Sequence, residues 1–143
     1  MIKTITERQA TVSGIQLKEQ FSPVGVIPVG RDRWMTTEAA RFCIDADISW
    51  VIIEIEAGFV SDMDSVPREV PLAHAWLKGR TRTAAIIHDA LYRNGVDREL
   101  ADAAFIRAMK LEGVRARYRY PIYWAVRLLG KAFYEKARVK HAT

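Results

Sequence analysis

The segment Thr83-Ala-Ala-Ile-Ile-His-Asp-Ala-Leu-Tyr-Arg-Asn-Gly95 decides how the second half of this sequence folds. Its apolar residues recur at helical spacing, which predicts an amphipathic helix up to Arg93. The Asn-Gly pair that follows is typical of a helix end, because both residues tolerate the left-handed backbone conformation found there. His88 and Asp89 interrupt the apolar run, and two adjacent polar side chains in such a helix need partners.

A second helix is predicted from Asp97, a favourable N-cap, to Leu111. Asp102 lies among its apolar residues, so this carboxylate also needs a hydrogen-bond donor. The short turn between the helices makes them antiparallel, which brings Asp102 toward His88. A His–Asp pair is typical of a general base, because the carboxylate fixes the tautomer of the imidazole and stabilises its protonated form. Tyr92, four residues beyond His88, lies on the same side of the first helix.

The whole sequence predicts a single α+β domain, with a small N-terminal antiparallel sheet followed by three helices. Residues 1–57 have the pattern of strands and turns, most clearly at Trp50–Glu56, where apolar residues alternate with glutamates. Residues 58–82 contain two prolines and no sustained period, which predicts a long ordered loop. Residues 83–140 are helical in pattern, and the third helix is expected to begin near Pro121, a residue that suits a first turn.

The composition limits the classes of function. The chain has 143 residues, half of them hydrophobic, and a single cysteine, Cys43, which excludes a disulfide framework or a CxxC zinc site. The net charge is +5, and residues 107–140 hold ten Lys or Arg against two Glu. Such a basic segment suggests an anionic partner, although on charge alone a solvated helical face is the favoured interpretation. No segment has the pattern of a signal peptide or a transmembrane helix, so we expect synthesis in a reducing cytoplasm.

A second polar cluster occurs within the predicted loop, in Gly58-Phe-Val-Ser-Asp-Met-Asp-Ser-Val-Pro-Arg68. Asp62 and Asp64 lie beside two serine hydroxyls, and Asp89 offers a further carboxylate. Oxygen ligands on a flexible backbone suit a hard cation such as calcium, although the spacing is not that of an EF-hand loop. A structural interpretation also stays open, in which the histidine is a core residue held by a carboxylate and the loop carboxylates cap turns.

The order of the polar motifs resembles that of a family of tailed-phage and prophage proteins classed as a domain of unknown function (thirteen-fifty-three). The motifs that carry this resemblance are Gly58–Arg68, Ala84–Tyr92, Ala101–Phe105 and Tyr123–Arg127, and the match runs from about Trp34 to the C-terminal helix. The resemblance implies a phage or prophage protein that is made in the host cytoplasm, and association with the virion stays open. It implies little about activity.

A second resemblance concerns chemistry. His88-Asp-Ala-Leu-Tyr-Arg-Asn94, with Asp102 and Phe105 on the next helix, is similar to the catalytic helix pair of the short prokaryotic and fungal phospholipases A2. This resemblance implies an antiparallel helix pair in which His88 is the general base that activates water against an ester. It further implies that Asp102 orients the histidine and that Tyr92 braces Asp102.

The same resemblance implies a calcium site. Ser61–Pro67 occupies the place of the calcium loop of those enzymes, which implies ligation by Asp62, the backbone at Met63, and Asp89. The loop departs from the family pattern in two ways: one of its glycines is replaced by Met63, and Asp64 adds a carboxylate. Those enzymes are also held by disulfides, whereas this chain has only Cys43. An anionic phospholipid surface is the partner that the resemblance implies.

Three other functions remain open from the sequence. A non-catalytic structural or assembly protein of the virion or tail would keep the helices for packing alone. A metal phosphohydrolase of the HD type needs a further histidine well upstream, and only His74 precedes the His-Asp pair closely. A nucleic-acid binder is suggested by arginines interleaved with aromatic residues at 115–131, but no specific nucleic-acid motif is present. The oligomeric state is not indicated.

Overall fold

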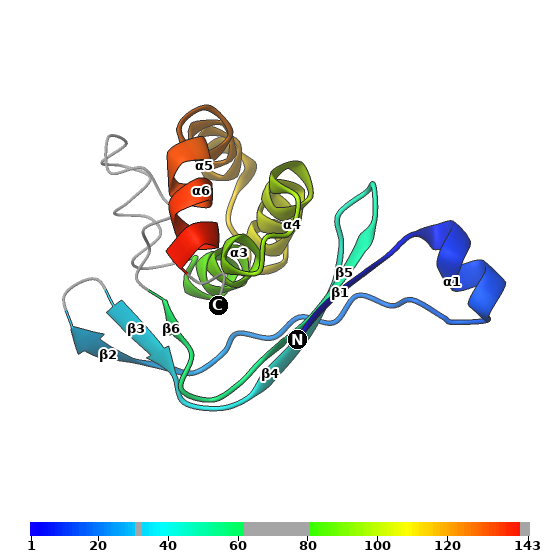
Figure 1. The fold of residues 1–143 in the computed structure, drawn as a ribbon, viewed down its shortest axis with the longest axis horizontal. Helices are drawn as coiled ribbons and strands as arrows, with labels where there is room; N and C mark the ends of the chain where they lie inside the picture. The colour runs from blue at the N-terminus through cyan, green and yellow to red at the C-terminus, as the bar shows by residue number, and fades with distance from the viewer. Residues whose placement is uncertain (31–32, 62–80, 141–143) are drawn as a thin grey trace.

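The structure, a computed structural model, describes residues 1–30, 33–61 and 81–140, and it has an α+β fold (Figure 1). Its elements in chain order are β1 (Ile2–Ile5), α1 (Glu7–Ser13), β2 (Val26–Gly30), β3 (Arg33–Thr36), β4 (Ala40–Asp45), β5 (Trp50–Ile55), β6 (Val60–Ser61), α3 (Arg82–Arg93), α4 (Arg98–Leu111), α5 (Ala116–Leu129) and α6 (Lys131–Lys140). No helix in this part of the chain has both the length and the apolar character needed to cross a bilayer.

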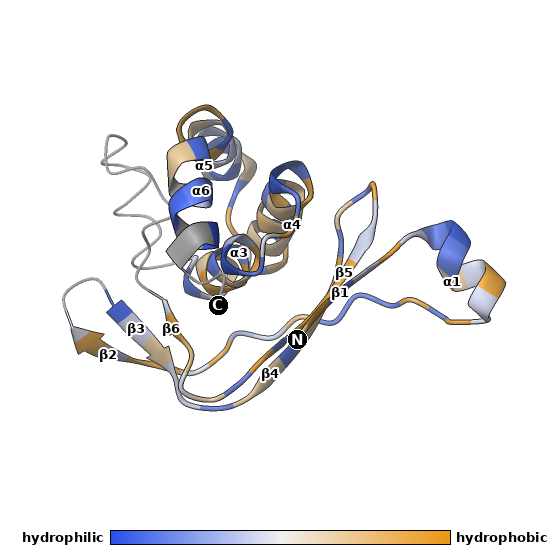
Figure 2. Cartoon of the chain, in the orientation of Figure 1, coloured by the Kyte–Doolittle hydropathy of each residue, from blue (hydrophilic) through white to orange (hydrophobic). Residues whose placement is uncertain are grey.

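The described strands form two three-stranded antiparallel sheets, where the sequence predicted one. The first has the order β1-β5-β4, with Ile2 opposite Ile53 and Ala40 opposite Ile55. Most residues of β4 and β5 are hydrophobic (Figure 2). The second sheet has the order β2-β3-β6, and its strand β6 lies within the segment predicted to be a loop. The rest of that predicted loop, residues 62–80, lies outside the described residues.

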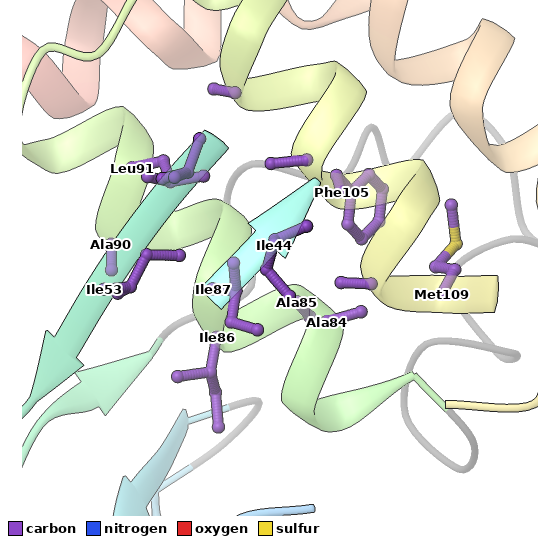
Figure 3. Close-up of a cluster of buried hydrophobic side chains, with 14 of the residues drawn as sticks. Ile44, Ile53, Ala84, Ala85, Ile86, Ile87, Ala90, Leu91, Phe105 and Met109 are labelled. Atoms are coloured by element: carbon purple, nitrogen blue, oxygen red, sulfur yellow. The ribbon is translucent and has the colours of Figure 1, made fainter. Parts of the chain in front are cut away.

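Helix α3 lies in the core of the molecule. Its residues from Thr83 to Tyr92 are all buried. The core joins α3 to Ile44 and Ile53 of the first sheet and to Phe105 and Met109 of α4 (Figure 3). A helix that is apolar on most sides can be buried in this way, and any polar residue it carries is then buried with it.

The antiparallel pair α3–α4 agrees closely with the sequence prediction and is fixed at both ends. Asp97 caps α4, since its side chain accepts a hydrogen bond from the backbone N–H of Leu100 at 3.4 Å. At the other end of the pair, Glu112 accepts hydrogen bonds from the N–H groups of Thr83 at 3.2 Å and Ala84 at 2.9 Å. These two N–H groups lack partners within their own helix, so Glu112 provides the cap that α3 needs.

Helix α1 was missed, because residues 1–57 were expected to contain mainly strands and turns and no helix was predicted at 7–13. The helix is nevertheless well defined by local signals: Thr6 and Gln9 form a reciprocal capping box at its start. Gly14 ends it with a φ of 70°, a conformation that suits glycine. A threonine followed by glutamine three residues later was the signal that could have identified this helix.

The third helix begins earlier than predicted, and the division of this region into two helices was not predicted. Helix α5 begins before Pro121, because the N–H groups of Tyr118 and Arg119 both bond to the Arg115 carbonyl and close a turn ahead of the proline. A proline inside the helix removes one N–H donor, which this helix tolerates.

The helical region then divides at Gly130 into α5 and α6. A Cβ at Gly130 would lie 3.2 Å from the Tyr92 hydroxyl and would collide with a backbone carbonyl, so close packing requires glycine there.

Candidate active site

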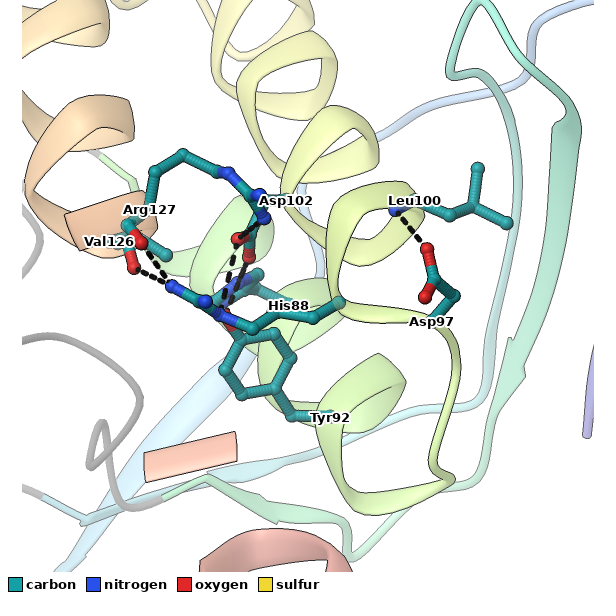
Figure 4. Close-up of polar contacts among 8 residues, drawn as sticks. His88, Tyr92, Asp97, Leu100, Asp102, Val126 and Arg127 are labelled. Carbon is teal, nitrogen blue, oxygen red and sulfur yellow. Dashed lines mark hydrogen bonds and ion pairs between the residues drawn. The ribbon is translucent and has the colours of Figure 1, made fainter. Parts of the chain in front are cut away.

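The two helices bring His88 and Asp102 together in the core (Figure 4). Nε2 of His88 lies 2.7 Å from Oδ1 of Asp102, and neither side chain is exposed. An ionised carboxylate can only accept hydrogen bonds, so the proton of a neutral imidazole must be on Nε2. Nδ1 of His88 therefore carries the lone pair, which is the state required of a base.

Tyr92 supplies a second donor to the same carboxylate. Its hydroxyl donates to Oδ1 of Asp102 at 2.6 Å. Burial raises the pKa of Tyr92 above its ordinary value, and the negative charge of Asp102 raises it further. The tyrosine is thus held in its protonated form, as a donor. Its ring is 4.1 Å from that of His88 and packs edge-on against Tyr134.

Two arginines complete the network, and neither was predicted from the sequence to belong to it. Arg127 of α5 donates to Oδ2 of Asp102 at 2.8 Å, with its side chain 27% exposed. Arg98 of α4 forms an ion pair with the same oxygen at 3.8 Å and donates to the backbone carbonyls of Val126 and Arg127. Arg98 precedes Asp102 by four residues, a spacing that could have identified it. Nothing local in the sequence indicates Arg127.

These donors keep Asp102 ionised. Burial alone would raise the pKa of the Asp102 carboxyl, but the hydrogen bonds from His88, Tyr92 and Arg127 outweigh burial and lower this pKa below its usual value. The carboxylate is therefore a permanent acceptor beside the imidazole at neutral pH.

The second nitrogen of the imidazole is buried without a partner among the described residues. Nδ1 of His88 has no hydrogen bond to any residue in the ranges 1–30, 33–61 and 81–140. The ring stacks on Phe105 with 4.4 Å between ring centroids and 29° between planes. Buried polar atoms in proteins are nearly always paired, so an unpaired ring nitrogen is an unusual feature of a core histidine.

The predicted calcium ligands are only partly within the described chain. Asp89 is 3% exposed, and both of its carboxylate oxygens accept hydrogen bonds from Arg93, at 3.1 and 2.9 Å. A cation at Asp89 would have to share these oxygens with the guanidinium or displace it. The other three predicted ligands, Asp62, Met63 and Asp64, lie outside the described residues. Within the described ranges, no group of three or more His, Cys, Asp or Glu could hold a metal ion. The calcium site stays a prediction.

Comparison with known proteins gives one match. Residues 34–126 match the family model described as "Protein of unknown function (DUF1353)", which is more than half of the chain. The matched range contains His88, Tyr92 and Asp102, while Arg127 follows immediately after it. No curated protein and no solved structure matches the chain.

Proposed function

The chain belongs to the DUF1353 family, and we propose that it is a phage or prophage protein whose histidine site hydrolyses an ester in the manner of a phospholipase A2. One observation carries the proposal: His88 binds Asp102 through Nε2 at 2.7 Å and leaves Nδ1 unbonded within the described residues. This is the arrangement that a general base requires, since the bonded nitrogen is oriented and the other can take a proton.

The proposed reaction uses the residues as follows. Nδ1 of His88 takes a proton from water as the water oxygen bonds to the ester carbonyl carbon. The resulting imidazolium is stabilised by Asp102, which Tyr92 and Arg127 hold in place. The same proton then passes to the departing alcohol oxygen as the carbon–oxygen bond of the ester breaks. His88 is fully buried, so a substrate reaches Nδ1 only when the side chains that cover it move.

Calcium is the cofactor that the resemblance to phospholipases implies. Among the described residues its one predicted ligand is Asp89, whose two oxygens are already bonded to Arg93. The reaction described above therefore takes no step through the ion. Calcium dependence is tested as a separate part of the proposal.

A second candidate is a non-catalytic structural or assembly protein of the virion or tail. The complete burial of His88 and Asp102 favours it, because the same network also ties α3, α4 and α5 together. In that case the network contributes to the specificity of packing and not to chemistry.

The test is fatty-acid release from anionic phospholipid vesicles, measured with added calcium and with a chelator. We expect His88→Asn to lower the rate by roughly 10²- to 10⁴-fold, the usual contribution of a general base. Tyr92→Phe keeps the ring and removes one hydrogen bond to a charged group, so it should lower the rate by about tenfold to a hundredfold. The matched control is Asp97→Asn on α4, which preserves the exposed helix cap and the rate.

Thermal melts of every variant distinguish the two candidates. Release that persists in folded His88→Asn would exclude the proposed base. No release by wild-type protein in either condition, together with a large loss of melting temperature in Tyr92→Phe, would support the structural candidate instead.

A further inference from the structure

Helix α5 exposes a row of large hydrophobic side chains. Tyr120, Trp124 and Leu128 follow one another at intervals of four residues and are 51%, 57% and 77% exposed. Residues at this spacing lie on one face of a helix. Leu129, next to the row, is 45% exposed. Single exposed hydrophobic residues are common, but a continuous row on one helix marks an interaction surface.

Basic residues border this row. Helix α5 contains Arg117, Arg119 and Arg127 and no Asp or Glu. Arg117 lies three residues before Tyr120 on α5, so it is placed along the same face, and Lys131 follows the row at the start of α6. The row is therefore an apolar and aromatic strip with positive charge on its borders.

We propose that this face of α5 docks on an anionic lipid bilayer, with the helix lying parallel to the surface. Trp and Tyr favour the boundary between headgroups and acyl chains, because each combines an apolar ring with a polar group. Bordering cations attract anionic headgroups and can extend toward them from a shallowly inserted helix. With 14 residues, α5 is about 21 Å long, which fits docking along the surface and not crossing it.

Charge favours a lipid surface over a second copy of the chain. Two copies of α5 face to face would bring Arg117 and Arg119 of each copy together without any acidic residue of α5 to offset them, whereas Arg127 is already paired with Asp102. Like charges placed together across an interface are destabilising. An anionic bilayer, in contrast, neutralises the same cations while it covers the apolar strip.

The docking face is connected to the candidate active site. Arg127, three residues after Trp124, donates to the buried carboxylate of Asp102 at 2.8 Å and is itself 27% exposed. The bilayer would thus lie against the helix that supplies one donor of the His88 network. The idea that the site meets its ester substrate at this surface rests on the proposed function. Docking of α5 on the bilayer does not depend on it.

The experiment measures binding to vesicles of ether-linked lipids, which contain no ester to hydrolyse. Flotation with vesicles of phosphatidylglycerol and phosphatidylcholine ethers is compared with flotation on phosphatidylcholine ether alone. We expect binding to the anionic vesicles only, and weaker binding as salt is raised. His88→Asn should bind like the wild type, so a failure of hydrolysis and a failure of docking are separate results.

A double variant tests the face itself. Trp124→Ser with Leu128→Ser should weaken vesicle binding by about tenfold or more, since two large apolar groups no longer insert. The matched control is Val12→Ser with Ile48→Ser, two residues that are 82% and 64% exposed elsewhere on the molecule. This control should bind like the wild type, and both double variants should melt like it.

Three results would overturn the proposal. They are no binding of wild-type protein to anionic vesicles, equal binding by the α5 double variant, and a concentration-dependent dimer that disappears in that variant. The last would show that a second copy covers the face.

Discussion

The interface between α3 and α4 and the outer face of α5 invert the usual distribution of residues. The first buries the charge of Asp102 and the imidazole of His88 completely, while the second exposes Trp124 and Leu128 to solvent. Charged groups are seldom fully buried unless they are paired, and rows of exposed hydrophobic residues are uncommon on monomers. Departures of both kinds concentrate at functional sites. Arg127 belongs to both regions, since it lies on α5 and bonds to Asp102.

The largest expected effect comes from removing the buried charge. Asp102→Ala would remove the carboxylate that four side chains share, those of His88, Tyr92, Arg98 and Arg127. Breaking a buried pair in this way lowers the free energy of unfolding by about 3–5 kcal/mol. Asp97→Ala, on the same helix but exposed, removes only a cap and should cost about 1 kcal/mol. Urea denaturation of the two variants measures the difference, and equal losses would contradict a special role for the buried carboxylate.

The next largest expected effect is a loss of folding stability at acidic pH. The pKa of Asp102 is lowered in the folded protein, so its contribution to stability is complete above the unfolded value, about 4, and is lost as pH falls below it. The pKa of Glu19 is also lowered, by its bond to Arg107, and changes stability in the same direction. Subtracting the urea midpoints of Asp102→Asn from those of the wild type, from pH 7 to pH 3, isolates Asp102. A difference that does not shrink toward pH 3 would show that this carboxyl is not held ionised.

The smallest expected effect is on the exposed face. Leu128→Ser should change the unfolding free energy by no more than about 0.5 kcal/mol, because an exposed side chain loses little on replacement. Val126→Ala, two residues away on the same helix and fully buried, should cost about 1–3 kcal/mol. If Leu128→Ser cost as much as Val126→Ala, the outer face of α5 would be covered in solution by protein.

Much of the helical half follows from local signals in the sequence. The pair α3–α4 could be predicted because its apolar period is strong, Asp97 is a good cap and Asn-Gly marks the turn between the helices. The start of α5 could not be placed by such rules. Pro121 suits a first turn, yet the bonds to the Arg115 carbonyl form a turn before it. The pairing of the six described strands into two sheets depends on long-range contacts, which no local pattern specifies.

The candidate active site could also be predicted only in part. His88, Tyr92 and Asp102 lie on two consecutive helices joined by one tight turn, so predicting the helices also predicted that these side chains meet. Arg127 lies on a later helix, and its contact with Asp102 depends on how α5 packs across the pair. Its contribution therefore required the three-dimensional structure.

The cap that Glu112 places on α3 has a consequence for the order of folding. It joins Glu112 to Ala84, 28 residues away, whereas β1 must reach β5 to pair Ile2 with Ile53. Shorter loops cost less entropy to close, so we expect the helix pair to form before β1 joins the first sheet. Amide exchange pulsed during refolding should show α3 and α4 protected earlier than β1. His88 and Asp102 would then be in contact before β1 has paired with β5.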